Sequence, residues 1–71
     1  DPDKVLFGRT VEIEREDGRR QSFRIVGEDE ADPAQGSVSY VSPLAKALMG
    51  RTVGDVVVVN GAEVEIVAVH P

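Results

Sequence analysis

Apolar and polar residues alternate along the chain from residue 10 onward. Val11 and Ile13 fall on one side of an extended segment, and glutamates fall on the other. A period of two built from β-branched residues is typical of a half-buried strand. The alternation returns around Phe23, after Asp17-Gly18, a pair that tolerates the positive φ angles of a tight turn. The pattern therefore predicts an antiparallel hairpin.

A third strand is predicted over residues 37–42, where Val38 and Tyr40 fall on the same side. The segment before it, residues 28–36, contains four carboxylates, one proline and one glycine. This composition predicts a loop between the first hairpin and the third strand.

The C-terminal part of the chain predicts a second hairpin. Four consecutive valines at residues 56–59 favour a central strand that is covered on both faces. Asn60-Gly61 follows, and it is the strongest two-residue hairpin signal in the chain. The last predicted strand then places these residues on its inner side: Val64, Ile66 and Ala68. Its end is apolar on both faces, so we expect the end to lie deeper than the start.

A short helix is predicted just before residue 50. The hydroxyl of Ser42 can cap the first turn, and Pro43 lacks an amide where none is needed. Gly50 can adopt the left-handed conformation that ends a helix. The apolar face of this helix consists of Leu44, Ala47 and Leu48. A helix of about two turns is marginal in water, so packing on the sheet must hold it.

The predicted order is hairpin, acidic loop, strand, short helix and second hairpin. An antiparallel-rich sheet of about five strands, with one short helix packed on it, buries the apolar faces of these elements. We therefore expect an α+β fold. The chain has 71 residues, which is enough for one small core and one domain.

Charge and composition narrow the range of partners. The net charge is −5, and an acidic surface repels phosphate backbones, so we expect no strong binding of nucleic acid by this domain. No apolar run approaches the roughly 20 residues that cross a bilayer, so we expect no membrane contact. The absence of cysteine excludes disulfides and is consistent with a reducing compartment, and we expect a cytoplasmic location.

The chain starts at Asp1, and its one methionine is Met49. Because translation begins with methionine, we expect a segment of a longer protein. In this interpretation residues 1–4 are the remnant of a linker and residues 5–71 form the domain.

The carboxylates of residues 28–32 are the first candidates for a metal site, since hard cations prefer several oxygen ligands. A calcium-binding loop has glycine at its sixth position and glutamate at its twelfth. Counted from Glu28, these positions hold Pro33 and Ser39. The spacing therefore favours solvated carboxylates, and we expect no bound metal.

The sequence gives little support for nucleophilic catalysis or for phosphate binding. The one histidine, His70, lies beside the last residue, where it is poorly placed to activate a serine or threonine. The glycines are scattered turn formers and not a phosphate-binding loop. We therefore expect no catalytic residue, no cofactor and no enzyme activity. What remains is a surface where the predicted third strand ends, the capped helix begins and Lys46 is exposed.

Four segments resemble the C-terminal domain of the bacterial transcript-cleavage factors of the GreA/GreB family. They are VLFGRTVEIE (5–14), FRIVGEDEAD (23–32), GSVSYVSPLAKALMGRTVGDVV (36–57) and AEVEIVAV (62–69). The resemblance covers the chain from Val5 onward. Residues 23–27 and the strand before the helix look more similar to the GreB branch than to the GreA branch.

This resemblance implies an FKBP-like domain without prolyl isomerase activity. It also implies docking on bacterial RNA polymerase, at the rim of the secondary channel near a coiled coil of the largest subunit. In the family, the acidic residues that assist transcript cleavage lie on a separate N-terminal coiled coil. No part of this chain has heptads, so we expect no stimulation of cleavage by this chain alone.

Carried over from the family, the polymerase-contacting segment falls on Val41, Ser42, Pro43 and the start of the helix, which includes Lys46. Members usually have Asp or Asn before the Ser-Pro pair, where this chain has Val41. Docking then uses more apolar contact, or is weaker, or meets a different partner surface. Equally, Val41 could be a strand residue packed under the helix.

Two other functions stay open. An FKBP-like prolyl isomerase would need an aromatic-lined pocket, and the chain offers Phe7, Phe23 and Tyr40 for it. A Gre-like regulator would bind polymerase or a kinase without promoting cleavage. Residues upstream of Asp1 would separate this regulator from a cleavage factor.

Overall fold

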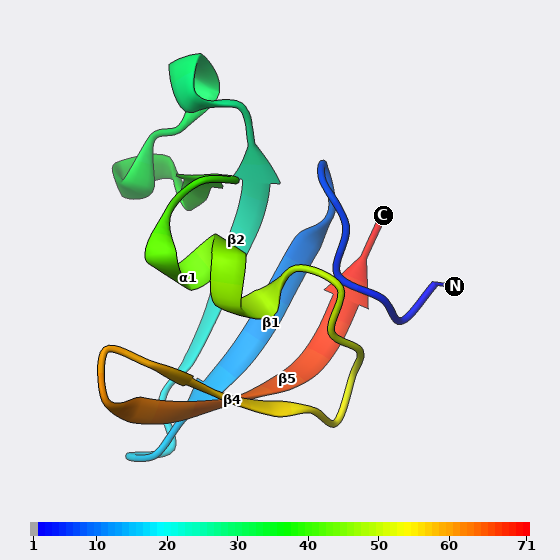
Figure 1. The fold of residues 1–71 in the computed structure, drawn as a ribbon, viewed down its shortest axis with the longest axis vertical. Helices are drawn as coiled ribbons and strands as arrows, with labels where there is room; N and C mark the ends of the chain where they lie inside the picture. The colour runs from blue at the N-terminus through cyan, green and yellow to red at the C-terminus, as the bar shows by residue number, and fades with distance from the viewer. Residues whose placement is uncertain (1) are drawn as a thin grey trace.

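Five strands form a single sheet in the computed structural model, which describes residues 2–71 (Figure 1). Their order across the sheet is β3-β2-β1-β5-β4. The strands are β1 (Thr10–Arg15), β2 (Arg20–Val26), β3 (Ser37–Ser39), β4 (Val56–Val59) and β5 (Ala62–His70). One α-helix, α1 (Pro43–Leu48), packs on one face of this sheet, the inner face. The acidic segment between β2 and β3 contains two single-turn 3-10 helices, η1 (Glu28–Glu30) and η2 (Pro33–Gln35).

The sheet is mostly antiparallel. β1 pairs antiparallel with both β2 and β5, and β4 pairs antiparallel with β5. β3 pairs with β2 in parallel, starting with Ser37 opposite Arg24. The connection through η1 and η2 returns the chain past the end of β2, so that β3 runs in the same direction as β2. The predicted α+β fold, with five strands and one packed helix, is confirmed.

Both predicted hairpins are present. Asn60 and Gly61 have φ angles of 53° and 79°, as the two-residue turn between β4 and β5 requires. In the first hairpin only Gly18 has a positive φ angle, at 87°. The loop there is four residues long, residues 16–19, and the amide of Arg15 donates to the carbonyl of Arg19 across it (2.7 Å).

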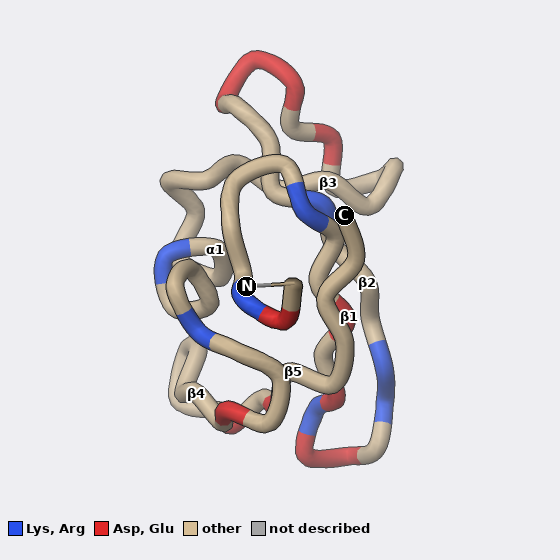
Figure 2. Tube along the Cα trace, turned by 90° about the vertical axis from the view of Figure 1, so that its right-hand side faces the viewer, with Lys and Arg blue, Asp and Glu red and all other residues tan. Residues whose placement is uncertain are grey.

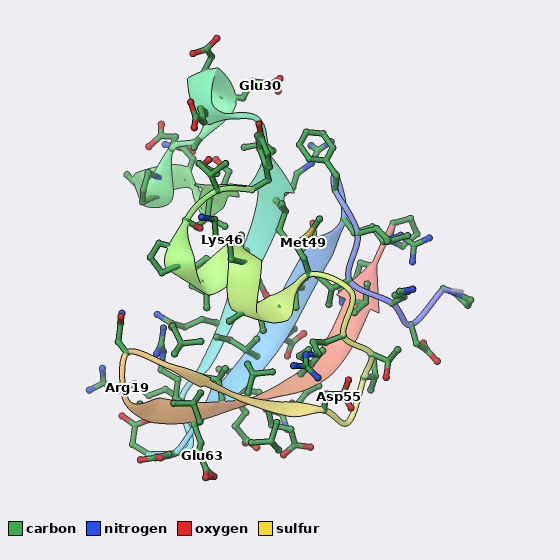
Figure 3. All side chains as sticks on the ribbon, in the orientation of Figure 1. Arg19, Glu30, Lys46, Met49, Asp55 and Glu63 are labelled. Carbon is green, nitrogen blue, oxygen red and sulfur yellow. The ribbon has the colours of Figure 1, made fainter. Side chains whose placement is uncertain are left out.

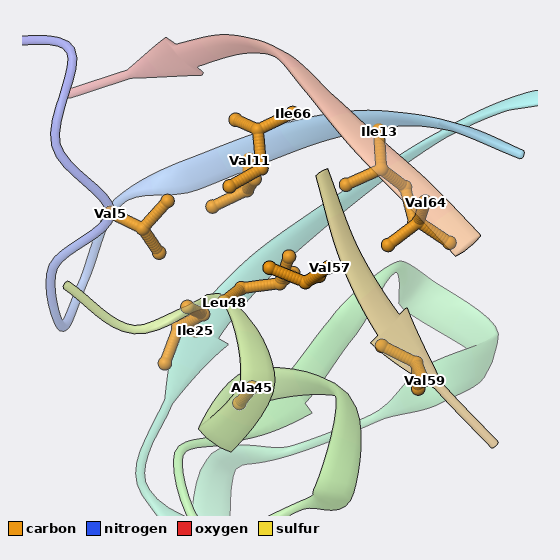
Figure 4. Close-up of a cluster of buried hydrophobic side chains, with 10 residues drawn as sticks. All are labelled: Val5, Val11, Ile13, Ile25, Ala45, Leu48, Val57, Val59, Val64 and Ile66. Atoms are coloured by element: carbon orange, nitrogen blue, oxygen red, sulfur yellow. The ribbon is translucent and has the colours of Figure 1, made fainter. Parts of the chain in front are cut away.

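The hydrophobic core lies between α1 and the inner face of the sheet (Figure 4). Its buried side chains are Val5, Val11, Ile13, Ile25, Ala45, Leu48, Val57, Val59, Val64 and Ile66. On the helix, Leu48 is buried as predicted, but Leu44 and Ala47 are only half-buried. Ala45 is the other buried residue of the helix, because residues three apart on a helix lie on the same face.

The prediction that β4 is a central strand covered on both faces is wrong. Within residues 2–71, β4 lies at the edge of the sheet and pairs with β5 alone. Val57 and Val59 are buried, whereas Val56 and Val58 are 56% and 63% exposed. An unbroken valine run predicts burial on both faces, but an edge position next to α1 needs only every second valine in the core.

The end of β5 also differs from the prediction. The pairing of β1 with β5 shifts between Glu12 and Ile13, so that Glu12 faces Ala68 while Ile13 faces Ile66. Val67 is therefore the extra residue of a β-bulge, which reverses the faces beyond it. Val69 packs against the core, and Ala68 turns to the outer face beside Glu12.

The residues before β1 are attached to the segment that follows α1. Lys4 forms an isolated antiparallel bridge with Thr52. The amide of Val5 donates to Arg51 (2.7 Å), and its carbonyl accepts from Gly50 (2.9 Å). Val5 is completely buried, a core position that alternation did not predict. The boundary at residue 5 stays a prediction, and Asp1 lies outside the described residues.

The α-helix of this fold is short. α1 has six residues, and within residues 2–71 no helix is long and apolar enough to span a bilayer.

The substitution Leu48→Ala should lower the free energy of unfolding by about 2–5 kcal/mol, because it removes the main contact between α1 and the sheet and leaves a cavity. Urea unfolding followed by circular dichroism measures the effect. Val58→Ala is the control, and its effect should stay within about 0.5 kcal/mol. If Val58→Ala were as costly as Leu48→Ala, the outer side of β4 would be covered in solution.

Candidate partner-binding site

The start of α1 is a fixed corner of the molecule. The Oγ of Ser42 accepts a hydrogen bond from the amide of Ala45 (3.2 Å), and Pro43 occupies the first helical position. The carbonyl of Ser42 accepts from the amide of Lys46 (2.9 Å). The predicted cap is confirmed, and it satisfies backbone groups that a helix start otherwise leaves free.

The predicted third strand is shorter than expected. β3 ends at Ser39, and Tyr40 and Val41 form a turn. The Oγ of Ser39 accepts from the amide of Val41 (3.2 Å), and the Ser39 carbonyl accepts from the amide of Ser42 (3.0 Å). Val41 is 37% exposed, so it is a surface turn residue and not a strand residue packed under the helix.

Lys46 supplies the positive charge of this region. Its side chain is exposed on α1 (Figure 3), and within residues 2–71 it takes part in no ion pair. Figure 2 shows this basic position on α1 in blue, apart from the acidic segment of η1 and η2 in red. The structure therefore brings Val41, Ser42, Pro43 and Lys46 together around one helix start.

An aromatic pair lies beside this corner, and the sequence did not predict it. Phe7 and Tyr40 meet edge to face, with ring centroids 5.8 Å apart and an interplanar angle of 72°. Both rings are exposed. The amides of Gly8 and Tyr40 donate to the carbonyls of Ile25 (2.8 Å) and Val26 (2.9 Å), which fixes both loops at the end of β2. The sequence does not predict this contact, because Phe7 lies in a segment without periodicity and its loop is far from Tyr40 along the chain.

The pair defines an exposed apolar edge. It consists of Phe7, Tyr40, Val41 and Pro43, and we call it the helix-start edge. Exposed aromatic rings are enriched at protein interfaces, and Ser42 and Lys46 add a polar group and a charge at the same place. Chemically, this arrangement can bind another protein surface.

In the acidic segment, one carboxylate binds the backbone of the segment itself. The carboxylate of Asp32 accepts from the amide of Ala34 (3.2 Å) and caps η2. Among residues 2–71, no group of three or more histidine, cysteine, aspartate or glutamate side chains can hold a metal ion. His70 is exposed and lies 3.9 Å from Glu12. No hydroxyl group is paired with it within the described residues.

The aromatic residues do not line one hollow of this structure, whose wall consists of charged residues and valines. That hollow lies between the ends of β1, β4 and β5, away from the inner face on which Phe23 packs. Phe7 and Tyr40 are on the surface. The three aromatic side chains that a prolyl isomerase pocket would use are thus divided between the core and the surface.

Comparison with known proteins then identifies the family. The family model described as "Transcription elongation factor, GreA/GreB, C-term" matches residues 1–71. This chain belongs to the GreA/GreB family.

Relatives from both branches of the GreA/GreB family match it. Transcription elongation factor GreB of Neisseria meningitidis serogroup B is 48% identical over 96% of this chain and 44% of its own length. Transcription elongation factor GreA of Desulfovibrio desulfuricans is 52% identical over 82% of this chain and 36% of its own length. The chain thus spans less than half of these relatives, and its likeness to GreB in particular stays a prediction.

Solved structures show the same fold. The GreA factor homolog 1 protein of Thermus thermophilus superposes with a TM-score of 0.87 at 32% identity, over 100% of this chain and 51% of that chain. A GreA/GreB elongation factor from Nitrosomonas europaea superposes with a TM-score of 0.82 at 24% identity, over 63% of its length. The helix-start edge therefore lies on a C-terminal domain of the GreA/GreB type.

Ser42→Ala should lower the free energy of unfolding by about 1 kcal/mol, because the amide of Ala45 loses its acceptor. Ser42→Asp should retain most of the stability, since aspartate also caps helices. Urea unfolding compares these variants with Ser22→Ala, which removes an exposed hydroxyl that has no hydrogen bond within the described residues. Equal stability of Ser42→Ala and Ser22→Ala would contradict the capping role.

Proposed function

We propose that this chain is the RNA polymerase-binding C-terminal domain of a GreB-like transcription elongation factor. In this proposal it anchors the factor at the rim of the secondary channel, near a coiled coil of the largest subunit, in the cytoplasm. The observation that carries the proposal is the exposed helix-start edge on a chain that matches the GreA/GreB C-terminal family over residues 1–71.

Rigidity of the helix-start edge supports an anchoring role. The Ser42 hydroxyl holds the first turn of α1, and backbone hydrogen bonds hold the turn at Tyr40 and Val41. Surface groups that are already ordered lose little conformational entropy on binding. A partner therefore meets an edge whose shape is formed in advance.

The chemistry of the edge favours apolar contact. Val41 stands where family members usually have Asp or Asn, and it cannot accept a hydrogen bond or pair with a basic group. Its neighbour Tyr40 packs against Phe7, which extends the apolar surface beside Val41. We propose that these side chains replace the polar contact, and that Lys46 adds attraction to an acidic group at the rim of the contact.

We propose that the domain performs no bond chemistry. In the family, the acidic residues that assist cleavage belong to an N-terminal coiled coil, and the described carboxylates of this chain form no metal-binding group. The same anchor would serve a Gre-like regulator that does not promote cleavage. The region outside this domain decides between these two factors.

Val41→Lys and Pro43→Ala should each weaken binding to core RNA polymerase by about tenfold, because both change the centre of the helix-start edge. Fluorescence anisotropy of the labelled chain measures the affinity. Val53→Lys is the matched control, since Val53 is 40% exposed and Val41 is 37% exposed. Unfolding curves verify that the fold is kept. An affinity loss of equal size for Val53→Lys, or no loss for Val41→Lys, would refute docking at this edge.

Added to stalled elongation complexes, the chain should compete with a full-length GreB factor and reduce transcript cleavage, without stimulating cleavage by itself. The reason is that it would occupy the anchoring surface but lacks the acidic coiled-coil tip. Gel analysis of cleaved transcripts gives the result, with Val41→Lys as the weakly competing control. Cleavage by the chain alone would contradict the proposed division of labour.

A further inference from the structure

The outer face of the sheet, which points away from α1, carries a second exposed surface. On β4 the side chains of Val56 and Val58 are 56% and 63% exposed. Figure 3 shows Glu63 extending on this side, away from Lys46 and α1. An exposed apolar edge strand is prone to contact with other chains.

Carboxylates surround these valines because of the strand register. Val56 faces Glu65, and Val58 faces Glu63, across the β4–β5 pair. Glu65 in turn faces Glu14 of β1. We call this surface the outer corner, and it consists of Glu14, Glu16, Val56, Val58, Glu63 and Glu65.

The outer corner contains a hollow of about 160 Å³. Glu14, Glu16, Glu63 and Glu65 contribute to its wall, and Val56 adds an apolar side. Pockets for cofactors and drug-sized molecules have about 300–1,000 Å³. The hollow therefore suits a single side chain of a partner better than a free organic ligand.

The negative charges of this corner are only partly balanced. Arg20 lies 3.5 Å from Glu14, and Arg15 lines the hollow but directs its Nε to Gln21. The outer corner thus has four carboxylates and only two neighbouring guanidinium groups. Glu63 and Glu65 have no side-chain ion pair or hydrogen bond within residues 2–71. Like charges directly opposite across strands, as in Glu14 and Glu65, destabilise a sheet, and the ion pair of Arg20 with Glu14 offsets part of this repulsion.

The backbone around the hollow is held in place. The carboxylate of Glu16 accepts from the amide of Glu63 (3.0 Å), which joins the β1–β2 hairpin to the β4–β5 hairpin. Both hairpin turns therefore flank the hollow in a fixed arrangement. A preformed site binds with a smaller loss of conformational freedom than a mobile one.

We propose that the outer corner docks a cationic amphipathic helix of a protein partner, with one arginine inserted into the hollow. The methylene groups of the arginine would pack on Val56, and its planar guanidinium would pair with Glu63 and Glu65. Leucine-like neighbours on the same helix face would cover Val58. Charge complementarity favours a cationic occupant, because the carboxylates repel nucleic acid and anionic lipid. This surface faces away from α1 and does not depend on the proposed polymerase contact.

The test uses a synthetic amphipathic helical peptide of about 18 residues with leucines and arginines on one face. Titration into the ¹⁵N-labelled chain, followed by NMR, should shift the amides of Val56, Val58 and Glu65 and leave those of Val41 and Lys46 unchanged. The double substitution Glu63→Gln with Glu65→Gln should weaken binding by about tenfold, since it removes both charged acceptors. Replacing every arginine of the peptide with glutamine should have at least as large an effect, and lysine should restore only part of the affinity.

The matched control is Glu28→Gln with Glu30→Gln, which removes the same charge from another exposed acidic segment. It should leave the affinity unchanged. Equal weakening by both double variants would overturn the proposal in favour of general charge attraction, and absence of binding would overturn it directly. Concentration-dependent self-association that shifts Val56 and Val58 without peptide would assign the surface to a second copy of this chain. No polymerase is present, so each of these results leaves the proposed anchoring role standing.

Discussion

The packing of Ala45 and Leu48 against the inner face of the sheet is the contact on which the rest of this domain depends. α1 has six residues, and helices of that length do not persist alone in water. Burial of a leucine side chain stabilises by roughly 1.5–3 kcal/mol, which is a large part of the stability that a domain of this size can have. The same contact positions Ser42 and Pro43, so the core and the helix-start edge are formed together.

Local rules predicted much of the fold. The Asn60-Gly61 turn, the cap by Ser42 and the alternation of Val11 and Ile13 are each encoded within a few residues, and each is present. The candidate site was predicted only in part. Val41, Ser42 and Pro43 form one corner, but Phe7 joins them through a contact between loops far apart in the sequence.

The errors arose where tertiary position overrides local pattern. A run of valines has the same sequence at a sheet centre and at an edge, so the exposure of Val56 and Val58 depends on the absence of a further neighbour for β4. The bulge at Val67 arises from its pairing with β1 and has no marker such as glycine. Val5 is buried because the segment after α1 binds it, which no periodicity records. Strand pairing and contacts between loops join segments that are far apart in the sequence, so a local pattern does not predict them.

The position of β5 has a consequence for biosynthesis. β5 is the last strand of the domain in the sequence, yet it lies between β1 and β4 and makes ladders with both. Until it leaves the ribosome, β1 has one free side and the β4 valines have no strand beside them. The domain therefore cannot assemble progressively from its N-terminal end. The β1–β2 hairpin can form earlier, but the sheet closes only once β5 is available to pair with both of its neighbours.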